Sequence, residues 1–383
     1  MIVVTGIGVV SALGIGVAQN YDSLKCSKSG LDKVKNFQTI HNVPVGEVKF
    51  TNDELKEKLG IPQRKKYSRT SLLGILAAKE ALEDAKISNG RIGLISATSV
   101  GGMDLTENIY PDMLEKGSLS EILRHDSADS TLCIGKYLNI KDFSTTISTA
   151  CSSSANAIML GCRMLNMGLL DYVVVGGTDA LCKFTLNGFK SLRILDDEKC
   201  RPFCKTRAGL NLGEGAAYLV LEKQSDKPHY GKVLGYANAN DATHQTATSD
   251  EGEGAYLSMK KALAKANINP SDIDYINVHG TATGNNDLSE GNAIKRVFTD
   301  NIPYFSSTKA FTGHCLAAAG AIEAVFSLLA IKNGVIFPNL NFVEPIDNDL
   351  IPHTSFSENL EIERVMSNSF GFGGNCSTLI FGK

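Results

Sequence analysis

The chain has 383 residues, of which 43% are hydrophobic and 21% are charged, and its formal net charge is −3. This length predicts two or three domain-sized units, and the small charge argues against a nucleic-acid or anionic-membrane surface. No uncharged apolar run reaches the roughly 18 residues that predict a membrane span. The opening "MIVVTGIGVV" lacks a basic n-region, so we expect a buried strand there and no signal peptide.

Short apolar runs alternate with helical patterns along the chain. Buried strands are predicted at residues 2–10, 91–98, 171–178, 216–223, 274–281 and 377–383. Helices are predicted at residues 68–87, 155–168, 255–268 and 318–334. The alternation is typical of an α/β protein with layered sheets and helices. We expect the charged stretch 51–69 to be a solvated surface segment and residues 196–215 to form a long functional loop.

A faint internal repeat divides the chain. The segment 145–165 can be laid beside 304–329, because each has a β-like run, a Ser-Thr dipeptide, a small-residue turn and then an apolar helix. "IGLISATSVGG" likewise resembles "YINVHGTATGN". Two such pairs in the same order predict two related halves, residues 1–225 and 226–383, packed about a pseudo-two-fold axis.

Nine cysteines are present, an odd number. Cys200 and Cys204 stand four apart, but no second pair or His-x-x-x-His motif completes a zinc site. Without a signal peptide, these cysteines indicate free thiols in a reducing cytoplasm.

Cys151 lies in "TACSSS", immediately before an apolar pattern with the 3.6-residue period of a helix. A thiol at a helix N-terminus is favoured as an anion, and such positions can lower the thiol pKa to about 3.5–7.5. A strand, a tight turn and a helix also form a nucleophile elbow. The alternative is a buried structural cysteine, and the local sequence leaves both interpretations open.

Two histidines follow predicted strands or small-residue turns. His279 ends an apolar strand, where sites collect in α/β sheets, although a lone histidine at a strand end is more often structural. His314 begins the second helix of the repeat, five residues after Lys309, whose ammonium favours a neutral imidazole. Glu323 is the one charged residue between Leu316 and Ile331, so it either pairs with Lys309 or emerges at the helix surface.

The tail "SNSFGFGGNCSTLIFGK" places three glycines around Phe372 before a last strand. These glycines allow the backbone to approach a ligand closely. No G-x-G-x-x-G motif sits between a strand and a helix, so no dinucleotide cofactor is indicated.

Together, "TACSSS", "HGTATGNND", "STKAFTGH" and "NSFGFGG" resemble the β-ketoacyl-acyl-carrier-protein synthases of the thiolase superfamily. The similarity covers nearly the whole chain, with the motifs in the family's order and approximate spacing. It implies a thiolase-like five-layered αβαβα fold of two duplicated halves. It also implies a homodimer, or a heterodimer with a related subunit, and a reaction without metal or organic cofactor. The implied partner is acyl carrier protein with its phosphopantetheine arm.

The resemblance also assigns roles to residues. Cys151 takes an acyl chain as a thioester, and malonyl-carrier protein then loses CO₂ and attacks it to give a 3-oxoacyl product. His279 and His314 stabilise the enolate, Lys309 and Glu323 support His314, and the backbone N–H groups of Cys151 and Phe372 form a second oxyanion hole. Phe372 also matches the family's gating phenylalanine. The remaining implied positions are Asp287 as a supporting residue and Thr281, Thr283, Thr246, Phe370 and Val100 as substrate-binding residues.

Some features depart from the family pattern and leave the substrate open. "HGTATGNND" lacks Pro-Leu-Gly before the aspartate, "GGNCS" replaces Gly-Gly-Thr-Asn, and the chain is shorter around residues 50–145. The resemblance therefore leaves two kinds of pathway open: fatty acid synthesis, and polyketide or polyene synthesis. The alternatives are a cysteine hydrolase, a degradative thiolase using Cys376 as a second cysteine, and a non-catalytic chain-length-type partner subunit.

Overall fold

Across residues 1–87, 89–116, 120–223, 227–299 and 301–383, which the computed structural model describes, the strands form one eleven-stranded sheet. Its order is β4-β3-β5-β6-β1-β7-β11-β10-β8-β9, with β2 paired on β1. The strands are β1 (Ile2–Ser11), β2 (Gly14–Ile15), β3 (Ile92–Ala97), β4 (Phe143–Ile147), β5 (Tyr172–Asp179), β6 (Gly215–Lys223), β7 (Gly231–Asn240), β8 (Tyr275–Asn277), β9 (Tyr304–Ser306), β10 (Arg364–Phe370) and β11 (Asn375–Gly382).

The same five-strand topology occurs twice. β1 pairs with β7 only where Ile2–Val4 meets Gly231–Val233, and this short join links two halves of the sheet. Outward from the join the order is β1-β6-β5-β3-β4 on one side and β7-β11-β10-β8-β9 on the other. In both halves the first two pairings are antiparallel and the outer two are parallel. The predicted duplication is therefore confirmed.

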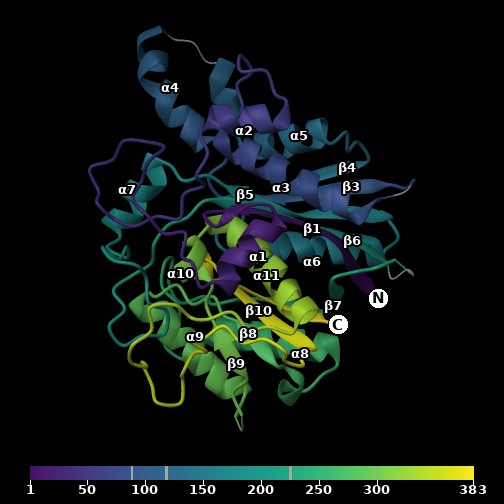
Figure 1. Cartoon of the computed structure of the whole chain (residues 1–383), viewed down its shortest axis with the longest axis vertical. Helices are drawn as coiled ribbons and strands as arrows, with labels where there is room; N and C mark the ends of the chain where they lie inside the picture. Colours follow the sequence, from purple (N-terminus) through teal and green to yellow (C-terminus); the bar gives the residue numbers. More distant parts are fainter. Residues whose placement is uncertain (88, 117–119, 224–226, 300) are drawn as a thin grey trace.

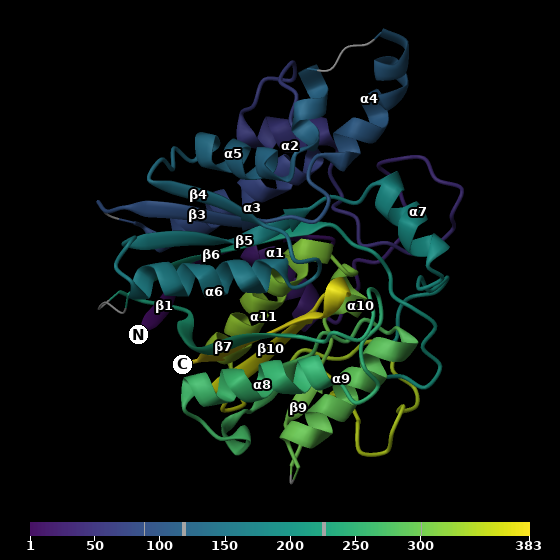
Figure 2. The same ribbon diagram turned by 180° about the vertical axis from the view of Figure 1, so that it is seen from behind.

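Helices fill the space between the two sheet halves and cover their outer faces (Figures 1 and 2). α6 and α11 lie in the middle, α3 packs on β1, β6 and β5, and α8 packs on β7 and β11 with α9 beside it. This arrangement confirms the predicted five-layered αβαβα fold. The helices are α1 (Val17–Lys25), α2 (Asn52–Leu59), α3 (Arg69–Ala85), α4 (Met103–Lys116), α5 (Ser127–Tyr137), α6 (Ser153–Asn166), α7 (Lys183–Ser191), α8 (Glu253–Ala266), α9 (Gly284–Val297), α10 (Lys309–Thr312) and α11 (Ala319–Asn333).

The central helix α11 is buried along almost its whole length, from Ala319 to Ile331. By length and composition the segment Leu316–Asn333 could cross a membrane, but 89% of it is buried inside the protein. Its position between the two sheet halves explains why it is apolar on every side. Glu323 is therefore held inside the core, and the alternative of a surface glutamate is wrong.

Each predicted strand and helix is present. Most of residues 51–69 are exposed, as expected, but the segment also contains α2, which begins with a capping box between Thr51 and Glu54 and buries Leu55 and Leu59. The charged residues of α2 outnumber its apolar ones, so the composition of the segment did not indicate its short buried face. Residues 196–214 contain no helix or strand and form the expected loop.

Candidate active site

Cys151 lies on a tight turn between β4 and α6. Ala150 just before it has φ 52°, a left-handed conformation that is uncommon for a residue with a side chain. The N–H of Thr149 donates to Oγ of Ser153 over 2.8 Å, which closes the turn as the helix begins. The predicted strand, turn and helix around the thiol are therefore present.

Both histidines come from the second half of the chain: His279 follows β8 and His314 precedes α11. The N–H groups of His279 and Gly280 donate to the two carboxylate oxygens of Glu290, over 2.9 and 2.8 Å. The N–H of His314 donates to the carbonyl of Asn211 over 2.7 Å, and its carbonyl accepts from Gly213. The long loop 196–214 thus holds the backbone of His314 in place.

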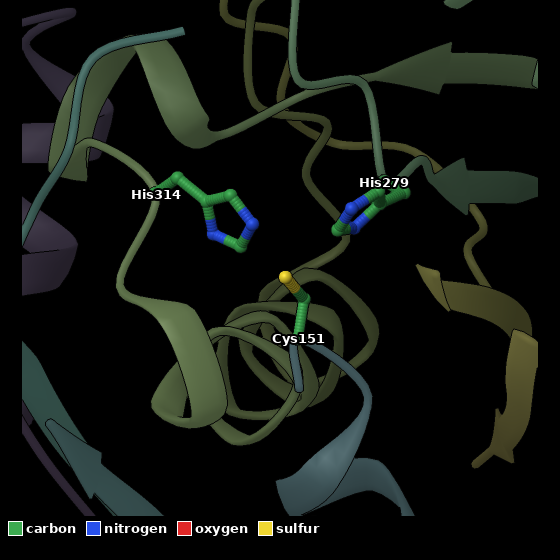
Figure 3. Close-up of side chains that lie close together, drawn as sticks. All are labelled: Cys151, His279 and His314. Carbon is green, nitrogen blue, oxygen red and sulfur yellow. The ribbon is translucent and has the colours of Figure 1, made fainter. Parts of the chain in front are cut away.

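Figure 3 shows the sulfur of Cys151 pointing between the rings of His279 and His314. The sulfur and one nitrogen of each ring all lie within 4.8 Å of one another. The ring centroids of the histidines are 5.3 Å apart and the rings are nearly perpendicular, at 83°. All three side chains are buried. Residues far apart in the sequence therefore form one cluster that can combine a nucleophile with two hydrogen-bonding imidazoles.

A buried ion pair lies behind the histidines. Nζ of Lys309 donates to Glu323 and also to the carbonyl oxygen of His279, the latter over 2.5 Å. Lys309 therefore makes its direct contact with His279, and it acts on His314 through its charge. Burial and this nearby ammonium hold the pKa of both His279 and His314 well below 6.5, so both imidazoles are neutral. Burial raises the pKa of Glu323 to about 7.

The expectation of a lowered thiol pKa for Cys151 is wrong. Burial raises its pKa to about 11, because removing the thiolate from water outweighs the charge of Lys309. The backbone N–H groups of Phe372 and of Cys151 itself approach the sulfur and act in the opposite direction. The resting side chain is thus a thiol, and its proton must leave as it reacts.

Gly371 brings the closing motif against the cysteine turn. A side chain at this position would meet the carbonyl of Thr149 at 2.8 Å and the nitrogen of Cys151 at 3.1 Å, so only glycine fits. The close approach directs the N–H of Phe372 at the thiol. The two N–H groups expected to form an oxyanion hole, those of Cys151 and Phe372, therefore both approach the Cys151 sulfur.

Two cavities meet at Cys151, with volumes of about 290 and 580 Å³. Phe372 and Phe189 line both, and their rings stack with centroids 5.9 Å apart. The first cavity holds most of the predicted site residues, namely His279, His314, Thr246, Thr281, Thr283, Phe370 and Phe372. Val100 lines only the second cavity, which is mainly apolar. A chain attached to the sulfur can therefore extend in one direction while a second molecule enters from the other.

Asp287 is buried and does not line either cavity. Its carboxylate accepts from the N–H groups of Phe203 and Ala282, over 2.8 and 3.0 Å. It therefore fixes the loop that carries Thr281 and Thr283, which agrees with a supporting position.

Cys376 lies opposite Phe370 on the neighbouring strand and packs in an apolar cluster with Met259 and Ala255 of α8. Burial raises its pKa to about 12, and it lines neither cavity. This placement argues against its use as a second catalytic cysteine.

Three residues near the site were missed in the sequence. Glu290 clamps the His279 loop, Phe189 on α7 stacks on Phe372, and Asn375 contacts the residue after the nucleophile. Glu290 carried a usable signal, since it follows Asp287 by one helical turn on a segment that begins directly after the histidine motif. Phe189 and Asn375 act through contacts between distant segments, which no local pattern predicts.

Comparison with known proteins agrees with this geometry. The family described as "Beta-ketoacyl synthase, N-terminal domain" matches residues 1–227, and its C-terminal domain matches residues 230–343. The 3-oxoacyl-[acyl-carrier-protein] synthase 2 of Staphylococcus aureus (strain COL) is 33% identical over 413 residues, which cover 100% of this chain and 98% of the relative.

Solved structures give the same answer. The ishigamide ketosynthase/chain length factor superposes with a TM-score of 0.91 at 29% identity, covering 100% of this chain and 98% of that one. A type II PKS acyl-carrier protein in complex with its ketosynthase bound to the hexaketide gives a TM-score of 0.86 at 27% identity, covering 100% and 98%. With both family domains matched and the relatives aligned over their full length, the chain belongs to the β-ketoacyl synthase family.

Proposed function

We propose that the protein is a 3-oxoacyl-acyl-carrier-protein synthase, an acyltransferase that condenses malonyl-carrier protein with an acyl chain held on Cys151. The observation that carries this proposal is the position of the Cys151 sulfur, between two neutral imidazoles and at the junction of two cavities. The nucleophile comes from residues 1–225 and both histidines come from residues 226–383, so each half supplies part of the site.

In the first step, the thiol of Cys151 attacks the thioester carbonyl of an acyl-carrier protein. The carbonyl oxygen becomes an anion within reach of the N–H groups of Cys151 and Phe372, whose preorganised dipoles lower the barrier. The thiol proton passes to a neutral imidazole and then to the departing pantetheine sulfur. The apolar cavity lined by Val100 accepts the acyl chain.

In the second step, malonyl-carrier protein enters through the cavity lined by Thr281 and Thr283. Loss of CO₂ leaves negative charge on the malonyl thioester oxygen, and His279 and His314 donate hydrogen bonds to it. Their neutral state matters, because each must present an N–H without releasing a full proton. The carbanion attacks the Cys151 thioester, which releases the sulfur and gives the 3-oxoacyl product.

The non-catalytic chain-length-type subunit is the second candidate, and one of the similar structures pairs a ketosynthase with such a factor. The intact cluster of Cys151, His279 and His314 favours a catalytic chain. Hydrolysis and thiolase chemistry are disfavoured by the second histidine and by the burial of Cys376, which lines neither cavity.

Acyl carrier protein is the proposed substrate carrier. The proposed dimer partner is a second copy of this chain or a related subunit, and the proposed location is the cytoplasm. Strand β4 ends one edge of the sheet, and its side chains from Phe143 to Ile147 are not fully buried. An unprotected edge strand is suited to pairing with another chain. Sedimentation equilibrium of the purified chain would show a dimer if a second copy suffices, and a monomer if a related subunit is needed.

The decisive experiment incubates the protein with acyl-carrier proteins of graded chain length and measures the intact mass. We expect an adduct of one acyl group that disappears in Cys151→Ala. In His314→Ala, malonyl decarboxylation should collapse while Cys151 still becomes acylated. No adduct at any chain length, or an adduct that survives Cys151→Ala, contradicts the proposed function.

A further inference from the structure

The three side chains that form the candidate active site also form a potential metal site. We propose that Cys151, His279 and His314 bind Zn²⁺, and that bound zinc blocks the site reversibly. Inhibition by zinc as a mode of regulation rests on the proposed function, whereas zinc binding depends only on the geometry of the three side chains. The ion is an inhibitor here and takes no part in the condensation.

The ligand atoms have the chemistry and nearly the spacing that zinc requires. Thiolate and imidazole are preferred zinc ligands, with Zn–S near 2.3 Å and Zn–N near 2.0–2.1 Å. A tetrahedral ion therefore holds such atoms about 3.3–3.6 Å apart. The three atoms lie within 4.8 Å of one another, so side-chain movements of about 1–1.5 Å close them around an ion.

The cavity supplies the remaining coordination position. Cys151, His279 and His314 all line the same cavity of about 290 Å³, and Figure 3 shows them converging from three separate segments. Three protein ligands with an open fourth position are the arrangement of accessible zinc sites. A water molecule can occupy that position, and substrate entry is then blocked at the sulfur.

Protonation and charge set the strength of the site. Both imidazoles are neutral and can offer a lone pair, while Cys151 must release its proton to solvent as the Zn–S bond forms. The ammonium of Lys309 opposes a dication, but its charge is partly offset because it is paired with Glu323.

The surroundings favour an exchangeable ion. Histidines that hold a resident metal usually donate their other ring nitrogen to a carboxylate or carbonyl. Among the residues that the structure describes, Nδ1 of His279 and Nδ1 of His314 have no hydrogen-bond partner. Without that support, a chelator should remove the ion and restore the free thiol.

The test uses Co²⁺ as a spectroscopic substitute for Zn²⁺ and needs no substrate. We expect the folded chain to give a thiolate-to-cobalt charge-transfer band with a stoichiometry of one, which Zn²⁺ displaces and Mg²⁺ does not. Cys151→Ser should abolish the band, and His279→Ala or His314→Ala should weaken binding by about tenfold or more. Cys26→Ser is the matched control, because Cys26 is exposed and outside the site.

Alkylation of Cys151 in the unmodified chain provides a second form of the test that does not depend on a variant folding. Iodoacetamide-treated protein should show no band, and zinc should slow alkylation of Cys151 by about tenfold when added well above its dissociation constant. A band that persists in Cys151→Ser or after alkylation overturns the proposal, as does the absence of a band in the folded wild type. A chain that binds cobalt but is never acylated would contradict only the proposed function.

Discussion

The side-chain oxygen of Asn375 accepts a hydrogen bond of 2.7 Å from the hydroxyl of Ser152, the residue directly after the nucleophile. It also accepts from the amides of Asn156 and Asn238, over 2.9 and 2.8 Å. Ser152 directly precedes α6, Asn156 lies on α6, Asn238 lies on β7 and Asn375 lies on β11. One amide therefore ties the turn of Cys151 to the second half of the molecule. Asn375 occupies the tail in which the sequence departs from the family pattern.

Asn375→Ala should therefore slow acylation of Cys151 more than it affects substrate binding. Loss of the Ser152 contact frees the turn, and we expect the acylation rate to fall about tenfold, close to the 1–1.5 kcal/mol of one hydrogen bond. Single-turnover acylation followed by mass spectrometry measures the change.

The conservative control is Asn375→Asp, which keeps an oxygen that can accept from Ser152 and should restore most of the rate. A double-mutant cycle with Ser152→Ala should show strong non-additivity if both residues act through their shared contact. Equal acylation rates for Asn375→Ala and the wild type, or additive effects in the cycle, contradict this positioning role.

The raised pKa of Cys151 predicts a steep pH dependence of its alkylation. Because the pKa is about 11, the thiolate fraction should increase about tenfold for each pH unit between 7 and 9. The measurement follows iodoacetamide modification of Cys151 by mass spectrometry in a Cys26→Ser background, which removes the exposed thiol. A rate that levels off below pH 8 would show instead that the helix terminus and Lys309 dominate.

The buried neutral histidines should make the fold less stable in mild acid. Their folded pKa lies well below 6.5, whereas in the unfolded chain each binds a proton near pH 6.5. The unfolded state therefore binds more protons below that pH, and stability is lost as pH falls, by up to about 1.4 kcal/mol per pH unit for each histidine. This contribution is fully present above about pH 7.

Urea unfolding of the wild type and of a His279→Gln, His314→Gln variant between pH 5 and 7.5 tests this. The wild type should lose stability more steeply than the variant as pH is lowered, since other titrating groups are common to both. Parallel curves would mean that the two imidazoles become protonated inside the folded protein.

Most of the fold was predictable from the sequence because its elements carry strong local signals. The apolar runs at β1, β5 and β6 are buried on both faces, and the small-residue helices α6 and α11 lie between the two sheet halves. β7 and β10 were not predicted, since polar residues interrupt their apolar pattern. Their pairing comes from tertiary contacts.

Some features of the candidate active site could likewise be predicted from the sequence, and others could not. Cys151, His279 and His314 could be found because each follows a strand or turn in a recognisable motif, and Figure 3 shows that they meet. The pKa of Cys151 could not be predicted, because the N-terminal position of a helix is visible in the sequence while the depth of burial is not. The stacking of Phe189 on Phe372 depends on how α7 packs, which the sequence does not encode locally.

A last prediction concerns Arg69 and Glu214, which form a buried ion pair at the N-terminus of α3. Their side chains are only 6% and 1% exposed, with contacts of 2.6 and 2.8 Å. Glu214 also accepts from the N–H groups of Val48 and Leu181, so it organises two loops as well as the arginine. Arg69→Ala leaves that carboxylate buried without its cation, and we expect the free energy of unfolding to fall by about 3–5 kcal/mol.

The matched control is Arg91→Ala, which breaks the pair that Arg91 forms with Asp171 at 3.0 Å, where the side chains are 54% and 47% exposed. Water already solvates both of these charges, so we expect a much smaller loss than for Arg69→Ala. Denaturant unfolding of the two variants at pH 7 provides the comparison. Similar losses for Arg69→Ala and Arg91→Ala would mean that the loops around Glu214 rearrange to solvate its carboxylate, and that burial of the pair does not set its strength.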